Sequence, residues 1–294
     1  MSREHLRSIA ETSLAAISSG RIVVNNLVYD ISPSVAESKL QTAYYAPDSL
    51  LATWETFSPA FLPPFRSSPT IEILETTTLA AARAAGTNGR KKPIGVLNFA
   101  SAEQPGGGFI NGASAQEESI ARSSTLYPSL MTPTAQQFYT LHSANDSGGL
   151  YTHAMIYSPR VVIFRLDDGN WALPMEIDVL TSPAVHAGLI RRRATTGSGH
   201  AVEASITLTM RERMARILFL FERRQVRNII LGSFGTGVFE NDVETIAGLW
   251  AELVGTRNAR FAHSFDYIAF AIVDNDTFTR FKRAFERTQR QGNS

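Results

Sequence analysis

Apolar and polar positions along the chain predict strands and helices in alternation. Short apolar runs bounded by turn residues are typical of strands that are buried on both faces. The predicted strands span residues 71–74, 94–100, 155–166 (interrupted by Pro159), 228–234 and 267–273. Apolar residues at helical spacing predict helices over 76–86, 115–130, 207–224, 241–254 and 277–290. Strand–helix alternation of this kind predicts an α/β fold in which helices cover both faces of one sheet.

The first 69 residues follow a different pattern. Residues 1–20 have the apolar spacing of an amphipathic helix that ends near Gly20, and 22–31 is a β-rich stretch broken by Asn25 and Asn26. Residues 47–69 contain five prolines and several serines, which indicates a connection rather than an element. We therefore predict an N-terminal helical and irregular extension over 1–69 and a main domain over 70–290.

Composition excludes several classes of function. With 28 basic and 27 acidic residues, the chain has no net charge that would recruit nucleic acid or a membrane surface. It has no cysteine, which rules out disulfides, thiolate zinc sites and cysteine nucleophiles. The six histidines show no metal-ligand spacing, so we expect neither a metal nor a cofactor. Without a signal peptide or an apolar run long enough to span a membrane, we expect an intracellular protein, cytoplasmic or nuclear.

A glycine-rich loop followed by acidic residues is the strongest chemical motif. Gly106, Gly107 and Gly108 precede Gln116, Glu117 and Glu118, giving the pattern GGG-x7-QEE. Glycines let backbone amides approach a phosphate or a ribose closely, and the N-terminus of the following helix favours anions. A purely structural alternative exists, in which Ser114 and Glu117 form a capping box and Glu118 pairs with Arg122.

A second glycine loop makes the structural alternative less attractive. Gly232, Gly235 and Gly237 follow a predicted buried strand, and Asn241 with Glu244 resembles a helix cap. The order of the glycines fits neither a Rossmann fingerprint nor a Walker A loop, and we expect backbone N–H groups there to hold a diphosphate. A tight structural turn is the alternative.

Asn98 is the third feature, because an amide near the end of an apolar strand is costly to bury without partners. Either neighbouring backbone satisfies it or it faces a ligand hydroxyl.

Together these segments resemble the microbial-type poly(ADP-ribose) glycohydrolases, a branch of the macrodomain superfamily. The matching stretches run from Asn98 to Phe109, over 112–118 and 126–130, and then over 181–184, 232–242 and 270–274. The resemblance implies a macrodomain-like three-layer α/β/α mixed sheet. Two departures are visible: Thr236 stands where a cysteine is common, and Val185-His186 replaces the expected Pro-Asn.

The resemblance also implies roles for individual residues. Glu118 would be the catalytic acid and base, while Glu117 and Asn98 would hold hydroxyls of the ribose whose bond is cut. We expect the substrate-binding residues to include Gly106, Gly107, Gly108, Phe109, Gln116, Gly235, Thr236, Gly237, Val238 and Phe239, with Phe270 as a candidate for the adenine pocket. The expected partners are poly(ADP-ribose) and ADP-ribosylated proteins as substrates and ADP-ribose as product, bound by a monomer.

The implied reaction is hydrolysis of the ribose–ribose bond through an oxocarbenium-like transition state. Glu118 would protonate the departing oxygen, which requires a raised pKa, and would then take a proton from the attacking water.

Other functions remain open from the sequence. The same loops could serve a non-catalytic reader of ADP-ribose or a hydrolase of mono-ADP-ribosylated proteins. A serine esterase built on Gly197-Ser198-Gly199 lacks the nucleophile elbow. Nucleic-acid binding by the basic helix at 277–290 is opposed by its apolar and acidic residues.

Overall fold

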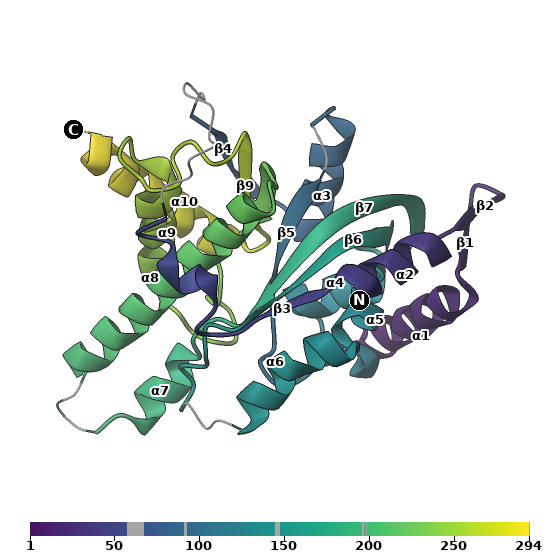
Figure 1. The fold of residues 1–294 in the computed structure, drawn as a ribbon, viewed down its shortest axis with the longest axis horizontal. Helices are drawn as coiled ribbons and strands as arrows, with labels where there is room; N and C mark the ends of the chain where they lie inside the picture. Colours follow the sequence, from purple (N-terminus) through teal and green to yellow (C-terminus); the bar gives the residue numbers. More distant parts are fainter. Residues whose placement is uncertain (58–67, 91–92, 145–147, 196, 198, 294) are drawn as a thin grey trace.

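The computed structural model describes residues 1–294 except 58–67, 91–92, 145–147, 196, 198 and 294. Part of the proline-rich connection and Ser198 of the esterase alternative therefore lie outside the described residues. A seven-stranded mixed sheet forms the centre of the molecule (Figure 1). Its strands in spatial order are β3 (Ala43–Tyr45), β6 (Met155–Arg165), β7 (Trp171–Ser182), β5 (Ile94–Phe99), β8 (Asn228–Leu231), β9 (Tyr267–Ile272) and β4 (Thr70–Glu75).

The sheet is parallel from β7 to β4 and antiparallel at the β3–β6–β7 edge. Consecutive strand residues point to opposite faces, so β5 places Leu97 in one hydrophobic core and Val96 in the other. Both faces are thus covered, which confirms the predicted three-layer α/β/α arrangement.

Two groups of helices cover the two faces (Figure 1). On one side lie α8 (Gly199–Arg223), α9 (Val243–Trp250), the π-helical turn η3 (Ala251–Gly255) and α10 (Asn275–Asn293). On the other lie α3 (Thr78–Thr87), α4 (Gln116–Ser123), α5 (Leu126–Leu130) and α6 (Pro133–Ala144). The predicted helix over 115–130 is two helices instead, because Ser124 leaves the helix and pairs with Ile163 of β6.

The sequence pattern missed β7. Polar residues such as Glu176, Asp178 and Thr181 interrupt its apolar run, and Pro174 lies in its first half. In the fold, Asp178 is satisfied by the hydroxyl of Tyr157 and the backbone N–H of Arg160, so tertiary contacts stabilise a strand that local sequence does not indicate.

The N-terminal residues contribute to the central sheet of the molecule. Residues 21–30 form a hairpin of β1 (Arg21–Val24) and β2 (Leu27–Asp30), and its turn residues Asn25 and Asn26 have positive φ. After α2 (Ser32–Gln41), β3 joins the central sheet beside β6. The segment before the predicted boundary at residue 69 thus contributes a strand, β3, to the central sheet.

The first helix, α1 (Arg3–Ser19), packs on the glycine-rich segment around the short helix η2 (Phe109–Asn111). Arg3 donates a hydrogen bond to the carbonyl of Asn111, and a Cβ on Gly112 would lie 2.2 Å from the carbonyl oxygen of Arg3. Within the described residues, no helix combines the length and apolar character that a membrane span requires.

Candidate active site

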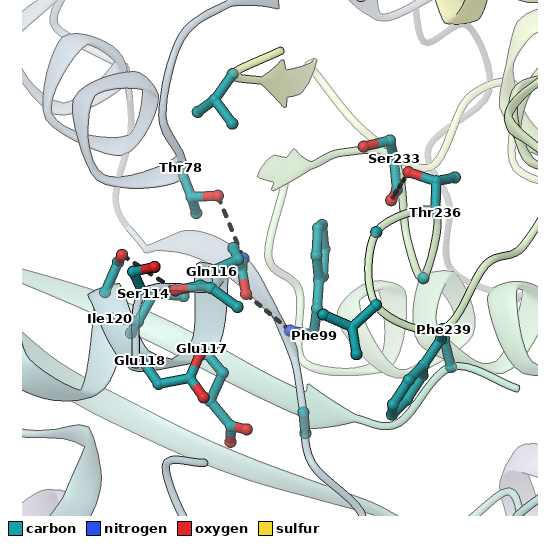
Figure 2. Close-up of a pocket in the computed structure, with 18 of the residues that line it drawn as sticks. Thr78, Phe99, Ser114, Gln116, Glu117, Glu118, Ile120, Ser233, Thr236 and Phe239 are labelled. Carbon is teal, nitrogen blue, oxygen red and sulfur yellow. Dashed lines mark hydrogen bonds between the residues drawn. The ribbon is translucent and has the colours of Figure 1, made fainter. Parts of the chain in front are cut away.

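A cavity of about 530 Å³ opens at the carboxyl ends of β5, β8 and β9 and at the N-terminal ends of α3 and α4. Ligands of open α/β sheets bind at this edge. Most of the wall comes from residues 77–79, 99–103, 114–120, 233, 235–239 and 271–274. The loops after β5 and β8, which the sequence singled out, therefore face each other across one pocket. Figure 2 shows Glu117 and Glu118 on one wall and Thr236 and Phe239 on the other.

Glu118 lies in the first turn of α4, where its side chain is 9% exposed. The backbone N–H of Gly108 donates a hydrogen bond of 3.0 Å to its Oε1. Its Oε2 is buried and has no hydrogen-bond partner. One oxygen is thus fixed by the backbone, and the other keeps an unused hydrogen-bond acceptor.

The structural alternative for the acidic pair is wrong. The N-cap of α4 is Ala115, which makes no side-chain cap, so Ser114 and Glu117 do not form a capping box. The buried Arg122 donates to the carbonyl of Ala113 and to Ser119, and it forms no ion pair with Glu118. Glu117 therefore does not take part in a helix cap, and Glu118 does not pair with Arg122.

Glu117 is 3% exposed and sits deeper than Glu118. Its Oε2 accepts from the backbone N–H of Ser101 at 2.6 Å, and its Oε1 accepts from Asn98 Nδ2 at 3.2 Å. Burial raises the pKa of Glu117 to about 8, although these two hydrogen bonds oppose the rise, and the charge of Glu118 adds to it. Burial and the neighbouring charge of Glu118 therefore favour the protonated form of Glu117.

Asn98 lies behind Glu117, fully buried, and does not itself line the cavity. Besides Glu117, its Nδ2 contacts Thr181 Oγ1 at 3.3 Å, while its Oδ1 has no partner. Of the two interpretations left open by the sequence, the structure shows an amide bonded to side chains, not to backbone, and still carrying one unused acceptor.

The three glycines do not line the cavity, and Gly107 packs directly against both carboxylates. Gly106 and Gly107 have φ of 71° and 59°, a region that L side chains rarely adopt. A Cβ on Gly107 would lie 2.3 Å from Glu118 Oε1 and 3.2 Å from Glu117 Oε2. The missing side chains therefore make room for the glutamates, a function that the motif alone did not reveal.

Phe109 is fully buried and does not line the cavity either. Its ring packs edge-on against Tyr127 at 5.0 Å and joins a small core with Ala10 of α1 and Ala121 of α4. It anchors the glycine loop from behind.

Gln116 lines the cavity, but its amide is occupied by protein atoms (Figure 2). Its Oε1 accepts from the backbone N–H of Phe99, and its Nε2 donates to the carbonyl of Leu97 and to Thr78. The side chain thus ties the end of β5 to the starts of α3 and α4.

The loop after β8 supplies Gly235, Thr236, Gly237, Val238 and Phe239 to the opposite wall. Thr236, which stands where the resembling family often has cysteine, turns its hydroxyl back to the carbonyl of Ser233 at 3.0 Å. Gly235 has a φ of 78°, and a Cβ there would lie 2.4 Å from Ala184. The backbone N–H of Thr236 donates to the carbonyl of Ser233 at 3.2 Å, so a ligand would have to use the other N–H groups of the segment.

The predicted cap of the next helix needs a correction. Asp242, not Asn241, caps α9, and it accepts from the backbone N–H of Thr245 at 2.8 Å. Asn241 instead donates to the carbonyls of Val185 and Gly235 at 2.7 and 3.0 Å, which closes the base of the glycine loop.

Phe270 does not belong to the pocket. It is fully buried among Trp250, Phe281 and Phe285, on the face of β9 that packs against α9 and α10. The pocket is lined by the residues that follow it, 271–274. The stretch 270–274 therefore does reach the pocket, but its aromatic residue Phe270 points into the core.

Several lining residues were missed by the sequence reasoning, among them Ser101, Tyr151, Asp167, Ala184 and Thr277. Ala184 and 271–274 follow the ends of β7 and β9, so the rule that ligands lie at the carboxyl ends of strands could have indicated them. Asp167, in the turn between β6 and β7, accepts a hydrogen bond from Thr77 at 2.6 Å, and only the folded chain brings these two residues together.

Comparisons with known proteins agree with this geometry. The family model for the microbial-type PARG catalytic domain matches residues 10–166, more than half of the chain. No curated protein sequence matched.

Among solved structures, the poly(ADP-ribose) glycohydrolase of Thermomonospora curvata is 35% identical, with a TM-score of 0.86 over 97% of this chain and 99% of that one. The same enzyme bound to the inhibitor ADP-HPD gives a TM-score of 0.83 at 35% identity, with the same coverage of both chains. The Deinococcus radiodurans enzyme in complex with ADP-ribose is 31% identical, with a TM-score of 0.73 over 88% of this chain and 98% of that one. The chain belongs to the microbial-type poly(ADP-ribose) glycohydrolase (PARG) family.

Proposed function

We propose that this protein hydrolyses the ribose–ribose O-glycosidic bonds of poly(ADP-ribose), releases ADP-ribose, and uses Glu118 as its acid and base. The observation that carries the proposal is the state of the Glu118 carboxylate. Its Oε1 is held by Gly108 N–H and its buried Oε2 has no partner, and Glu118 lines the cavity together with the loop after β8. Family membership supplies the reaction type.

Each residue of the pocket has a role that follows from its position. Glu118 protonates the departing ribose oxygen and then accepts a proton from the attacking water, steps of a kind worth about 10²–10⁴-fold in rate. Glu117 binds hydroxyls of the same ribose, and Asn98 orients it from behind. Backbone N–H groups of 235–239, apart from that of Thr236, hold the diphosphate, and Phe239 forms the wall beside the ribose. The fixed geometry of loop and carboxylate is what makes the reaction effectively intramolecular.

Replacing Glu118 tests the proposal. We expect Glu118→Gln to lower kcat for ADP-ribose release at least about 10²-fold while the Kd of ADP-ribose stays within a few-fold of wild type. Glu244→Gln is a matched control, because Glu244 also lies in the first turn of a helix but outside the cavity. Release of ADP-ribose from defined polymer is measured by chromatography, and binding by calorimetry.

The same assay separates the alternatives. Wild-type protein that binds ADP-ribose but releases none from polymer would be a reader. Release from mono-ADP-ribosylated peptides but not from polymer would assign the activity to protein-linked ADP-ribose.

A further inference from the structure

His186 stands directly behind the aromatic wall of the pocket. Its imidazole stacks on the ring of Phe239, with centroids 4.6 Å apart and planes 19° apart. Phe239 lines the cavity, whereas His186 does not. The histidine therefore supports the wall without being placed to touch the substrate.

The loop that carries Phe239 is open to solvent at its tip. Val238 is 75% exposed, and a Cβ on Gly237 would meet no atom within 4 Å. Asn241 fixes only the base of the loop. Apart from His186, the ring neighbour of Phe239 is Tyr151, with centroids 6.0 Å apart and a tilt of 37°. Phe239 also packs against the main hydrophobic core, so the stack on His186 is one of the contacts that set the orientation of its ring.

His186 is itself fixed at two points. Its backbone N–H donates to the carbonyl of Gly149 at 2.8 Å, and its Nδ1 accepts from the backbone N–H of Leu189 at 3.2 Å as the N-cap of α7 (Ala187–Arg193). The second residue of that helix, Gly188, donates its N–H to the carbonyl of Phe239 at 3.1 Å. The imidazole cannot turn away from Phe239 without uncapping α7, so ring, helix and loop form one unit.

We infer that His186 is a positioning residue, which holds the ring of Phe239 in the orientation that binds the ribose beside Glu118. The inference rests on the proposed function, because the role of Phe239 does. It also accounts for a departure from the family pattern: a histidine in place of asparagine keeps an acceptor for the helix cap and adds a ring for the stack.

Two substitutions separate the cap from the stack. His186→Asn keeps a side-chain acceptor for Leu189 but removes the ring, and His186→Phe keeps a ring but removes the acceptor. We expect His186→Asn to weaken ADP-ribose binding about fivefold at a stoichiometry near one, and to lower kcat/KM on polymer at least as much. His186→Phe should bind ADP-ribose within about twofold of wild type although it unfolds at a lower temperature.

A double-mutant cycle tests whether His186 acts through Phe239. Phe239→Leu and the double variant His186→Asn/Phe239→Leu should bind ADP-ribose equally weakly, because the stack is already absent from the single variant. Additive losses would overturn the inference, as would wild-type binding by His186→Asn or equal losses in His186→Asn and His186→Phe.

Failure of the inference about His186 can be told apart from failure of the proposed function. Wild-type protein that binds ADP-ribose without cleaving polymer contradicts hydrolysis but leaves the binding cycle intact as a test of His186. Wild-type protein that does not bind ADP-ribose contradicts both. Additive losses in an active enzyme contradict only the role of His186.

Discussion

Gly107→Ala tests the idea that Gly107 makes room for the carboxylates of Glu117 and Glu118, the proposed catalytic pair. The added Cβ would lie 2.3 Å from Glu118 Oε1, whereas ordinary contact begins at 3.4 Å. The carboxylate must therefore move by about 1 Å, and a misplacement of that size costs about 10²-fold in rate. The backbone adds a second cost, because φ at Gly107 is 59° and an L residue there loses about 1–2 kcal/mol of stability.

Gly89→Ala is the matched control. Gly89 has a φ of 69°, and its Cβ would meet no atom within 4 Å, so it carries the same backbone penalty without the contact. Both variants should lose about 1–2 kcal/mol of unfolding free energy in urea. Only Gly107→Ala should lose about 10²-fold in kcat for ADP-ribose release. A Gly107→Ala enzyme that works within about threefold of Gly89→Ala would refute the reasoning, since a carboxylate displaced by about 1 Å cannot keep its rate.

Three further predictions follow from buried residues. Phe270→Leu should lower the unfolding free energy by on the order of 1 kcal/mol and leave the Kd of ADP-ribose unchanged, because the ring lies in the core; weaker binding with unchanged stability would restore its assignment to the pocket. Arg165 is 4% exposed and donates to Ser13, Thr12 and the carbonyl of Gly169, so Arg165→Met should cost about 2 kcal/mol in urea unfolding, and an unchanged midpoint would contradict this. Burial raises the pKa of Glu117 from an ordinary 4.5 to about 8, so its contribution to stability is full below 4.5 and is lost as pH rises toward 8. From pH 5 to pH 8, wild type should lose on the order of 3 kcal/mol relative to Glu117→Gln, and parallel pH profiles in urea unfolding would rule this out.

The strands of the parallel half and the helices around them could be predicted because their signals are local. Buried strands such as 94–99 are continuous apolar runs, and the inward face of α8 has apolar residues at helical spacing, including Met210, Met214 and Phe221, all fully buried. Strand β7 could not be predicted, because its polar residues find partners only across the sheet, as Asp178 does with Tyr157. Strand β3 has three residues, too few for a recognisable pattern.

In the GGG-x7-QEE motif, too, some features follow from local sequence and others only from tertiary contacts. Three glycines and two glutamates at a fixed spacing, together with the family resemblance, were enough to point to Glu118. The local pattern fitted a capping box equally well, and only the fold shows Arg122 bonded elsewhere and Gly108 N–H directed at Glu118.

The sequence by itself determined the α/β class, the two loops that form the pocket and the acidic pair, since each depends on residues close together in the chain. Tertiary structure decided whether each side chain points into a core or into the pocket. It placed Phe270 and Phe109 in cores, turned Gln116 inward to bind backbone, and brought Asp167 and Tyr151 to the pocket from distant segments. The physical reason is that packing and hydrogen-bond satisfaction are settled between elements, and a linear pattern records only one side of each contact.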